Sequence, residues 1–435
     1  MESMKSDREG KEMKETGKPV DRAIVVGLDL SGAGDAEEAD RSLDELAELV
    51  RAAGGVVVGR MMQRRDSPDS ATYVGKGKTL ELKSAGDSLD ADLLVFDDEL
   101  SGSQIRNIEE IVGRRTIDRS MLILDIFALR AASREGKLQV ELAQLQYRKS
   151  RLVGMGVAMS RLGGGIGTRG PGESKLETDR RHIGRRILAL KQDLATVGDH
   201  RDRVRSRRRG GEAFVVAVAG YTNAGKSSIV NRLCGVDLFA EDMPFATLDP
   251  TARRMPLEDG REIVLVDTVG FIRKLPHHLV DAFRSTLEEV AQADVVVHVV
   301  DVSDPESGRQ MEIVESLLTE LGAAALPRLT VYNKADRVDL LPAAAKTGGS
   351  TFVVSALTGE GLDALRGAIE SLAPGGLVPV HLLLPYDKAG MVDWLHGHGR
   401  GIATVYGEDG IDVRGSLRED CLPDVAPWRV EGRGE

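Results

Sequence analysis

Residues 220–227 have the residue types and the spacing of a phosphate-binding loop. They read Gly220-Tyr-Thr-Asn-Ala-Gly-Lys226-Ser227 and fit the pattern G-x-x-x-x-G-K-[ST]. The glycines let the backbone curve so that its N–H groups point at phosphate oxygens, and the partial positive charge of a helix N-terminus adds to the attraction. We therefore expect a nucleotide site in which Lys226 bridges the β- and γ-phosphates and the Ser227 hydroxyl ligates Mg²⁺.

A second segment, Asp267-Thr-Val-Gly270, follows the apolar run 263–266. A carboxylate at the end of a buried strand can face the phosphate-binding loop and hold Mg²⁺ directly or through water, and the N–H of Gly270 can then approach the γ-phosphate. Taken alone, the segment also fits an ordinary turn after a strand. Its position forty residues after Ser227 makes the nucleotide interpretation much stronger.

A third segment, Asn333-Lys-Ala-Asp336, points to the base of the nucleotide. The Asp336 carboxylate offers two acceptors to the N1–H and N2–H donors of guanine, a pair that adenine lacks, so this element favours GTP over ATP. The segment Ser355-Ala-Leu357 follows another apolar run and is expected to contact the guanine O6 through its backbone. A polar surface loop is the alternative interpretation of residues 333–336. It becomes less favoured than base binding once residues 220–227 are accepted as a phosphate-binding loop.

The stretch Phe245-Ala-Thr247-Leu-Asp249 lies between the first two motifs. We expect Thr247 to complete the Mg²⁺ shell when the γ-phosphate is present and to leave when it departs, which is an order–disorder switch. Thr251 is a nearby rival that the spacing alone does not exclude.

The residue after Gly270 is Phe271, near the place where an efficient GTPase commonly has a glutamine that orients the attacking water. Because phenylalanine cannot orient water, we infer a slow intrinsic hydrolysis that a partner or an ion accelerates. Asn223 is a candidate for holding a monovalent cation such as K⁺ near the phosphates. The alternative is that Asn223 only stabilises the loop.

These motifs together define the expected site. Three residues are assigned to catalysis, namely Lys226, Thr247 and Gly270, and two to metal binding, namely Ser227 and Thr247. The residues expected to bind GTP or GDP are Gly220, Tyr221, Thr222, Asn223, Ala224, Gly225, Lys226, Ser227, Phe245, Ala246, Thr247, Leu248, Asp249, Asp267, Thr268, Val269, Gly270, Asn333, Lys334, Ala335, Asp336, Ser355, Ala356 and Leu357.

The chain that must position these residues is long enough for several hydrophobic cores. It has 435 residues, of which 41% are hydrophobic, and ~150 residues per domain suggests about three domains. Its two cysteines exclude a disulfide scaffold and a Cys-rich metal site, and they fit a reducing cytoplasm. No apolar run approaches the ~20 residues of a membrane span, and the charged N-terminus lacks the apolar core of a secretory signal. We therefore expect a cytoplasmic protein.

We expect a multi-domain α/β fold. Residues 22–125 alternate apolar runs with amphipathic stretches, a pattern typical of a parallel sheet with helices. Its expected strands are 23–28, 56–58, 93–96 and 121–124, and its expected helices are 41–52 and 104–112. The expected domains are a disordered tail (1–21), an N-terminal α/β domain (22–133), a basic helical hairpin with a glycine-rich loop (134–210), a P-loop G domain (211–374) and a small α+β C-terminal domain (375–435).

Within the G domain, apolar runs before the motifs predict strands at 214–219, 263–266, 329–332 and 351–354. The small C-terminal domain should contain a strand at 378–384. A β-hairpin should follow, with strands at 404–406 and 411–413 around Gly407-Glu-Asp-Gly410.

Two stripes of apolar residues predict that the helical hairpin is a coiled coil. Residues of the second stripe are spaced 4, 3, 4 and 3 apart, which is a heptad seam. Between the two helices, residues 161–173 include six glycines, so no stable helix or strand interior is expected there. The stripes are Leu138, Leu142, Leu145 and Leu152 on one helix and Ile183, Ile187, Leu190, Leu194 and Val197 on the other.

Charge is distributed unevenly along the chain. The net charge is −11, yet residues 148–210 hold 17 Lys and Arg against 6 Asp and Glu, a net of +11 that leaves −22 for the remainder. A basic block in an acidic chain is typical of a local phosphate-binding surface, and the glycine-rich loop with Arg161 and Arg169 makes RNA the natural candidate. The alternatives are a solvated helix face, a flexible linker and a hairpin that docks another protein.

With these motifs in hand, the chain closely resembles the HflX family of ribosome-associated GTPases from residue 22 to 375. The glycine-rich loop followed by Leu176-Glu-Thr-Asp-Arg-Arg181 is far more specific to this family than any nucleotide motif, and the C-terminal tail is a looser match. The other segments that carry the resemblance are Tyr73-Val-Gly-Lys-Gly-Lys78, Asp118-Arg119, Ile123-Leu-Asp-Ile-Phe127, Gly136-Lys-Leu-Gln-Val-Glu-Leu-Ala-Gln-Leu145, Gly220–Ser228, Phe245–Thr251, Asp267–Ile272 and Asn333–Asp336.

The resemblance implies a GTPase that binds the large ribosomal subunit and its rRNA. In the family, binding to stalled or idle ribosomes promotes their splitting, notably under stress, and the hairpin would reach ribosomal RNA near the peptidyl-transferase region. The resemblance also implies GTP or GDP with Mg²⁺, no DNA partner, no requirement for a membrane, and a monomer. The alternative is a GTPase that binds another structured RNA, such as tRNA, or assists ribosome assembly.

Overall fold

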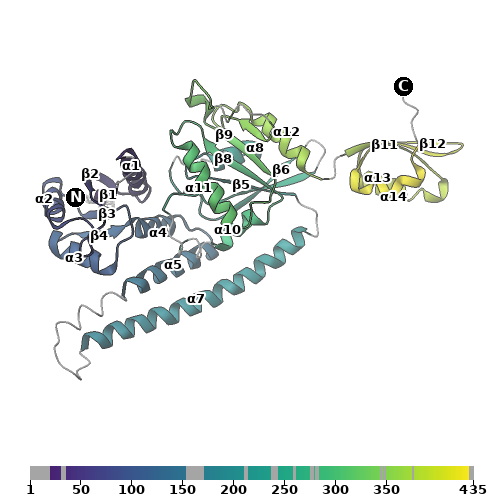
Figure 1. Ribbon diagram of the computed structural model, residues 1–435. Helices are drawn as coiled ribbons and strands as arrows, with labels where there is room; N and C mark the ends of the chain where they lie inside the picture. Colours follow the sequence, from purple (N-terminus) through teal and green to yellow (C-terminus); the bar gives the residue numbers. More distant parts are fainter. Residues whose placement is uncertain are drawn as a thin grey trace, which may run out of the picture. The chain divides into compact units, whose positions relative to one another are not determined.

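The computed structural model describes residues 20–30, 36–152, 171–209, 214–236, 243–257, 261–274, 279, 284–342, 345, 349–374 and 377–430 (Figure 1). The chain divides into two compact units. The first comprises the chain up to residue 126 together with residues 150–173, and the second comprises residues 127–149 and 174–435. Within the described ranges, no helix combines the length and the apolar character that a membrane crossing requires.

The first unit contains a four-stranded parallel sheet with strand order β2-β1-β3-β4. Apolar residues of the strands pack against the helices in one core, which includes Ile24, Leu82, Phe96 and Ile108. The parallel α/β arrangement confirms the interpretation of the alternating pattern. The elements are β1 (Arg22–Asp29), α1 (Ala36–Ala52), β2 (Val56–Arg64), α2 (Lys76–Leu89), β3 (Leu93–Phe96), α3 (Gly102–Val112), β4 (Arg115–Asp118) and the beginning of α4 (Arg119–Arg130).

One expected element of this unit was wrong. Residues 121–124, expected as a strand, lie inside helix α4, and the strand is the preceding β4, whose first residue is a charged arginine. The Asp118 carboxylate accepts a hydrogen bond from the Met121 N–H at 3.0 Å and so starts the helix. A short apolar run that is buried on all sides has the same pattern in a strand and in a helix, which explains the error.

A buried ion-pair cluster lies at the carboxyl end of this sheet. The Arg119 side chain is only 2% exposed, and its guanidinium pairs with Asp97 at 2.8 Å and with Glu45. The second carboxylate oxygen of Asp97 accepts a hydrogen bond of 2.6 Å from the Ser42 hydroxyl. Charges removed from water in this way are stable only while they stay paired.

In the second unit, helix α5 (Arg134–Leu152) and helix α7 (Pro171–Arg209) pack side by side (Figure 1). Leu142, Ile187 and Leu190 form the buried centre of their contact, which confirms that the two apolar stripes pack against each other, although Leu152 and Val197 are not part of the cluster. Arg186 of α7 also forms two hydrogen bonds of 2.7 and 2.8 Å with Glu141 of α5. Four further stripe residues pack around this centre, namely Leu138, Leu145, Ile183 and Leu194.

The expected glycine-rich loop, 161–173, falls mostly in the segment 153–170, which is outside the described residues. Its last three residues, 171–173, are the first residues of α7.

The centre of the second unit is a six-stranded sheet with strand order β10-β9-β8-β5-β7-β6. All neighbouring strands are parallel except β6, an antiparallel edge strand, and the expected strands at 214–219, 263–266, 329–332 and 351–354 are confirmed. The elements are β5 (Phe214–Gly220), α8 (Lys226–Leu233), β6 (Thr251–Pro256), β7 (Glu262–Asp267), α10 (Arg284–Ala291), β8 (Val295–Asp301), α11 (Ser307–Glu320), β9 (Arg328–Asn333), η1 (Ala335–Arg337), β10 (Thr351–Val353) and α12 (Leu362–Leu372).

Apolar side chains of strands and helices from β5 to α12 form one hydrophobic core around this sheet. Valines of β5 and β8 pack with Leu265 of β7, Ile229 of α8 and Leu365 of α12. Since β5, β7, β9 and β10 are parallel, their carboxyl ends meet at one edge of the sheet, and each of the four is followed by one of the expected motifs.

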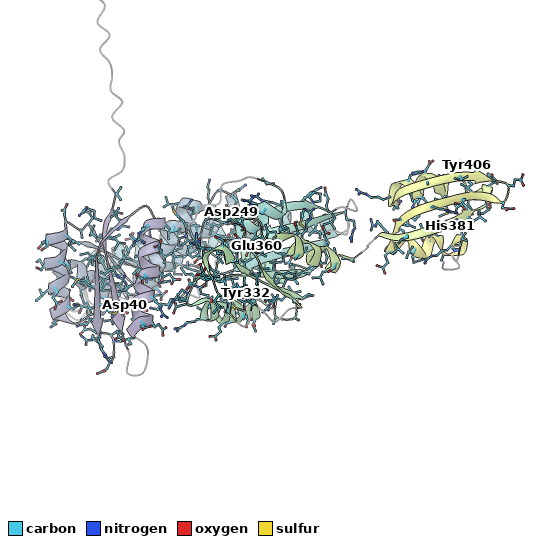
Figure 2. All side chains as sticks on the ribbon, turned by 90° about the horizontal axis from the view of Figure 1, so that it is seen from above. Asp40, Asp249, Tyr332, Glu360, His381 and Tyr406 are labelled. Carbon is cyan, nitrogen blue, oxygen red and sulfur yellow. The ribbon has the colours of Figure 1, made fainter. Side chains whose placement is uncertain are left out.

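The C-terminal segment forms an antiparallel sheet with order β11-β13-β12, covered by helices α13 and α14. The two strands of the expected hairpin pair from Gly407 with Gly410 onward, which confirms the turn. The His381 and Asp412 side chains form a hydrogen bond of 2.7 Å between β11 and β13. Tyr406 is exposed at the end of the hairpin (Figure 2). The elements are β11 (Leu377–Leu384), η3 (Tyr386–Lys388), α13 (Met391–His398), β12 (Gly399–Gly407), β13 (Gly410–Arg418), η4 (Glu419–Cys421), α14 (Leu422–Val425) and η5 (Ala426–Trp428).

The buried cluster around Arg119 predicts a strong effect of Arg119→Met on the first unit. The substitution keeps most of the side-chain volume but removes the guanidinium that pairs with two carboxylates, so we expect a loss of ~3–5 kcal/mol. The measurement is the rate of amide hydrogen exchange in β1 and β3. Arg115→Met is the matched control, because Arg115 is 54% exposed and lies 3.7 Å from Asp21; its cost should stay below ~1 kcal/mol. Equal protection in the two variants would contradict the role of the cluster.

Candidate nucleotide site

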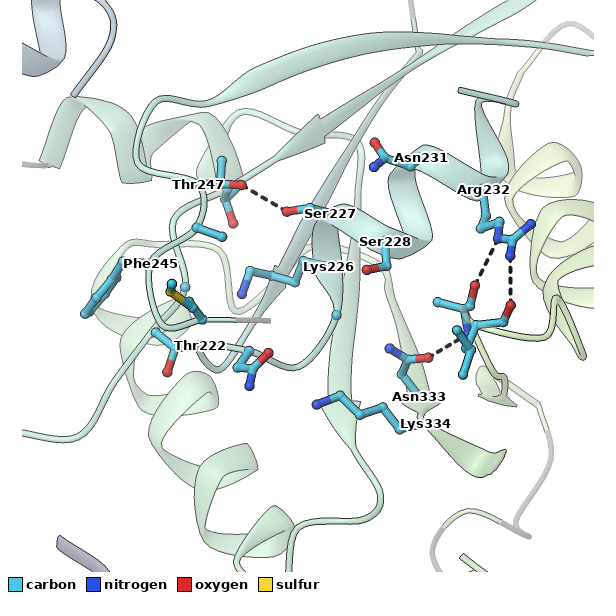
Figure 3. A pocket seen from close by; sticks show the side chains of 18 of the residues that line it. Thr222, Lys226, Ser227, Ser228, Asn231, Arg232, Phe245, Thr247, Asn333 and Lys334 are labelled. Carbon is cyan, nitrogen blue, oxygen red and sulfur yellow. Dashed lines mark hydrogen bonds between the residues drawn. The ribbon is translucent and has the colours of Figure 1, made fainter. Parts of the chain in front are cut away.

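The loop between β5 and α8 has the backbone of a phosphate-binding loop (Figure 3). Asn223 and Gly225 adopt left-handed conformations, with φ of 60° and 90°. A Cβ at position 225 would lie 2.2 Å from the side-chain nitrogen of Asn333, so only glycine fits there. The sharp turn brings the first residues of α8 to the carboxyl edge of the sheet, where the helix N-terminus attracts anions.

Lys226 is buried in this loop. Its ammonium group donates hydrogen bonds to the carbonyl oxygens of Tyr221, at 2.8 Å, and Gly220, at 3.2 Å. Burial lowers the pKa of Lys226 to about 8, and the negative charge of Asp267 opposes that shift. A phosphate group would add a closer negative charge, which stabilises the protonated lysine.

Three side-chain oxygens meet beside the loop. The Ser227 hydroxyl donates to Asp267 Oδ2 at 2.6 Å, the Thr247 hydroxyl donates to the same atom at 3.0 Å, and the two hydroxyls are 2.9 Å apart. The other carboxylate oxygen of Asp267 is buried and has no hydrogen-bond partner among the described residues. Thr251, the rival of Thr247, is the exposed first residue of β6, so the geometry favours Thr247.

These oxygens fit a magnesium ion. Mg²⁺ prefers oxygen ligands and is usually bound through few protein groups together with phosphates and water. The buried oxygen of Asp267 without a hydrogen-bond partner is what a site for such an ion provides. Groups of three or more His, Cys, Asp or Glu side chains that could hold a metal are absent from the described part of the chain.

Gly270 and Phe271 close the site on the side of β7. The Thr222 N–H donates to the Phe271 carbonyl at 2.7 Å, and the Phe271 N–H donates to the Gly220 carbonyl at 3.1 Å. A Cβ at position 270 would lie 2.9 Å from Thr222 and 3.0 Å from the Lys226 ammonium nitrogen, so the close approach requires glycine. The Phe271 ring is 1% exposed and does not line the cleft, in keeping with the expectation that it cannot orient water.

The base side of the site is held together by Asn333. Its side-chain N–H donates to the Ala224 carbonyl at 2.9 Å, and its side-chain oxygen accepts from the Ala356 N–H at 3.0 Å. Asn333 therefore joins the phosphate-binding loop to the segment 355–357. Asp336 lies on η1 at the rim of the cleft, where its carboxylate accepts a hydrogen bond of 2.5 Å from the Ser355 hydroxyl.

Arg232 is a site residue that the motifs did not reveal. It projects from α8 and donates to the carbonyls of Ala356, at 3.0 Å, and Leu357, at 2.7 Å (Figure 3). These contacts fix the segment that was expected to contact the guanine O6. Arginine near a helix C-terminus is common on protein surfaces, so no signal in the sequence distinguishes Arg232 from a solvated arginine.

The expected residues enclose a cleft of about 540 Å³. The members of the expected set that line it are Thr222, Asn223, Gly225, Lys226, Ser227, Phe245, Ala246, Thr247, Thr268, Gly270, Asn333, Lys334, Asp336, Ala356 and Leu357. The members that do not line it are Gly220, Tyr221, Ala224, Leu248, Asp249, Asp267, Val269, Ala335 and Ser355. A residue of the second group can still hold a lining residue in place, as Asp267 does by accepting a hydrogen bond from Ser227. Lining residues outside the expected set are Ser228, Asn231, Arg232, Val236, Met243 and Arg337.

The side chain of Asp249 corrects one expectation. It was expected beside the nucleotide, but its carboxylate accepts hydrogen bonds from the N–H groups of Ala132, at 2.9 Å, and Ser133, at 2.8 Å. Two residues earlier, Thr247 points to Ser227. The reason is that the segment has two sides, one turned to the cleft and the other to the beginning of α5.

Comparisons with known proteins agree with this geometry. Residues 40–128 match the family described as "GTP-binding GTPase N-terminal", 130–208 the "GTP-binding GTPase Middle Region", 215–334 the "50S ribosome-binding GTPase" and 340–417 the "HflX C-terminal domain".

Individual relatives match along most of the chain. The GTPase HflX of Caldanaerobacter subterraneus is 48% identical over 405 residues, which is 93% of each chain. The GTPase HflX of Escherichia coli is 40% identical over 369 residues, covering 84% of this chain and 86% of the relative. Among solved structures, the complex of SsGBP with GDP is 25% identical, covers 81% of this chain and 98% of its own, and superposes with a TM-score of 0.49.

The position of Asp336 predicts a change of base preference in the variant Asp336→Asn. The amide presents an N–H toward the base, where guanine needs a second acceptor and xanthine offers a carbonyl. We expect the affinity for GTP to fall on the order of 100-fold, with a relative gain for xanthosine triphosphate. Equilibrium binding of fluorescent nucleotides measures both. Asp339→Asn, an exposed neighbour, is the control and should bind GTP normally. An unchanged preference in Asp336→Asn would show that this carboxylate does not bind the base.

Proposed function

This chain belongs to the HflX family of GTPases, and we propose that it is a nucleotide-controlled switch that binds the large ribosomal subunit through its RNA. It hydrolyses GTP, as the relatives that share most of its length are named to do. The finer statement, that binding promotes the splitting of stalled or idle ribosomes, is part of the proposal. So is its place of action, the cytoplasm, where ribosomal subunits are found.

The observation that carries the proposal is the exposed row of arginines on α7. Arg181 and Arg185, four residues apart on one face of the helix, are exposed, and the apolar stripe of the same helix is packed against α5. A helix that buries one side in its own protein and presents arginines on the other is suited to the phosphates of a structured RNA. The family description "50S ribosome-binding GTPase", matched at 215–334, supports the large subunit as the source of that RNA.

The geometry of the nucleotide site supports a switch that senses the γ-phosphate. Ser227, Thr247 and Asp267 would hold Mg²⁺, which would supply charge compensation for the β- and γ-phosphates. Lys226 would turn from the carbonyls that it now contacts toward the same oxygens. Asn223 lines the cleft, and we extend the proposal to K⁺ held there as a further positive charge.

Hydrolysis in this site depends on positioning. The buried Phe271 leaves the attacking water without a side chain to orient it from that position, so we propose that the bound ribosomal subunit completes the site. After the γ-phosphate leaves, Thr247 loses part of its attachment, and the affinity for the subunit falls.

The first test is the retention of the full chain on purified large subunits. With a non-hydrolysable GTP analogue we expect at least about tenfold tighter binding than with GDP, because a coupling of that size is typical of nucleotide switches. Subunits should also accelerate GTP hydrolysis. Equal retention with both nucleotides would refute the switch, and stronger binding to free tRNA than to subunits would favour the alternative, another structured RNA.

A second prediction concerns the arginines of α7. Arg185→Glu should weaken subunit binding at every salt concentration and reduce the slope of log affinity against log salt by about 1. Arg254→Glu is the matched control, because Arg254 is 76% exposed on β6 and does not lie on the hairpin. If the two variants bind subunits equally well, α7 is not the RNA-binding surface.

A further inference from the structure

The segment from Met243 to Asp249 has a second set of contacts that the nucleotide does not explain. Thr247 faces Ser227 and Asp267, whereas Asp249 faces residues 132–136 at the beginning of α5. Both sets lie within the second unit. The segment therefore connects the metal-binding side of the cleft with the first turn of a helix that contributes nothing to the cleft itself.

Asp249 accepts three hydrogen bonds from Ala132 and Ser133, the two residues that directly precede α5. Its Oδ2 accepts from the N–H groups of Ala132 at 2.9 Å and Ser133 at 2.8 Å, and its Oδ1 accepts from the Ser133 hydroxyl at 2.5 Å. The Ser133 hydroxyl in turn accepts from the Gly136 N–H at 2.8 Å, which caps the helix. A carboxylate at a helix N-terminus is further stabilised by the helix dipole.

The fit of Gly136 shows how closely the two elements approach. A Cβ at this position would lie 2.3 Å from Asp249 Oδ1 and 3.1 Å from the Ser133 hydroxyl. Only glycine leaves room for the carboxylate, although glycine is a poor helix former. The lower helix propensity of glycine is therefore found at the position where α5 contacts the Asp249 carboxylate.

Phe245 adds an apolar contact to the polar ones. Its buried ring meets the Phe127 ring edge to face at a centroid distance of 4.8 Å. Phe245 has a φ of 56°, a left-handed conformation that is unfavourable for a bulky residue. Such a conformation persists where the surroundings hold it, and it is frequent in switch segments.

From these contacts we propose that Asp249 and Ser133 are positioning residues for GTP hydrolysis, because they hold the segment that carries Thr247 against the beginning of α5. The inference rests on the role proposed above for Thr247. It adds residues 127–136, which lie before the nucleotide-binding motifs, to the machinery that orders the switch.

The contact works in both directions. If GTP orders Thr247, the same ordering strengthens the attachment of Asp249 to α5; conversely, a fixed α5 favours the ordered position of Thr247. Helix α5 packs on the basic helix α7 through Leu142, Ile187 and Leu190. The contact of Asp249 with the beginning of α5 therefore connects the switch segment to α7 through a single helix.

Hydrolysis by serine variants of the full chain tests the proposal. We expect Ser133→Ala to lower the single-turnover rate by ~3–10-fold with little change in the affinity for GDP, because one of the three hydrogen bonds to Asp249 is lost and the two from backbone N–H groups remain. Ser101→Ala is the matched control. The Ser101 hydroxyl caps α3 by accepting a hydrogen bond from the N–H of Gln104, three residues later, just as Ser133 accepts from Gly136, and Ser101 does not contact the segment 243–249. It should hydrolyse GTP at the normal rate.

A glycine pair separates positioning from helix stability. Gly136→Ala should make α5 a better helix and yet slow hydrolysis, since its methyl group displaces the Asp249 carboxylate. Gly184→Ala in α7, where a Cβ meets no atom within 4 Å, is the control and should leave the rate unchanged. A capping role alone would not produce opposite effects on helix stability and on hydrolysis.

Thr247→Ala distinguishes failure of this inference from failure of the proposed function. We expect it to slow hydrolysis strongly, and adding Ser133→Ala should cause no further loss, because both act through one segment. Amide exchange at Ser133 and Gly136 should be slower with a non-hydrolysable GTP analogue than with GDP.

If Thr247→Ala is slow while Ser133→Ala and Gly136→Ala hydrolyse normally, or if the exchange is the same with both nucleotides, the positioning role is refuted and the role of Thr247 stands. If Ser133→Ala loses affinity for GDP as much as it loses rate, its effect is general damage, which also refutes the proposal. If Thr247→Ala hydrolyses normally, the proposed switch residue is wrong, and the inference falls with it.

Discussion

The meeting of Ser227, Thr247 and Asp267 is the interaction on which the nucleotide site depends. Two hydroxyls donate to one oxygen of a buried carboxylate, and the other oxygen has no hydrogen-bond partner in the described part of the chain. A buried carboxylate in this state is costly without a cation. The parallel strands, the left-handed loop and the segment of Thr247 all serve to bring these groups to one place, and together they favour the binding of a metal–phosphate complex.

A second constraint holds the two halves of the cleft at a constant spacing. Asn333 bonds at once to the phosphate-binding loop and to the segment 355–357, and Gly225 has no side chain because the Asn333 amide occupies that space. Base recognition and phosphate binding therefore share one buried side chain. This arrangement explains why an asparagine stands at the end of β9: its amide donates to the Ala224 carbonyl and accepts from the Ala356 N–H.

Much of this could be predicted because the sheet is parallel. When each strand is followed by a motif and all strands run the same way, their order in the chain already places the motifs together, and the nucleotide cleft followed from that rule. Residues 121–124 were assigned wrongly, since a short buried run has the same pattern in a strand and in a helix. Asp249 and Arg232 lay beyond prediction for another reason: the direction of a side chain in an irregular segment, and the partner of one surface arginine, depend on packing between segments far apart in the sequence.

The register of the sheet edge has a consequence for how the switch segment can move. Thr251 pairs with Asp267 at the start of β6, and the antiparallel ladder continues from there to Pro256. The segment that carries Thr247 and Asp249 is therefore fixed to the sheet at its C-terminal end. Its first paired residue, Thr251, lies opposite Asp267, whose carboxylate accepts the hydrogen bond from Thr247. Thr251 is therefore a fixed end for any displacement of Thr247, and Asp249, two residues before β6, would move less than Thr247.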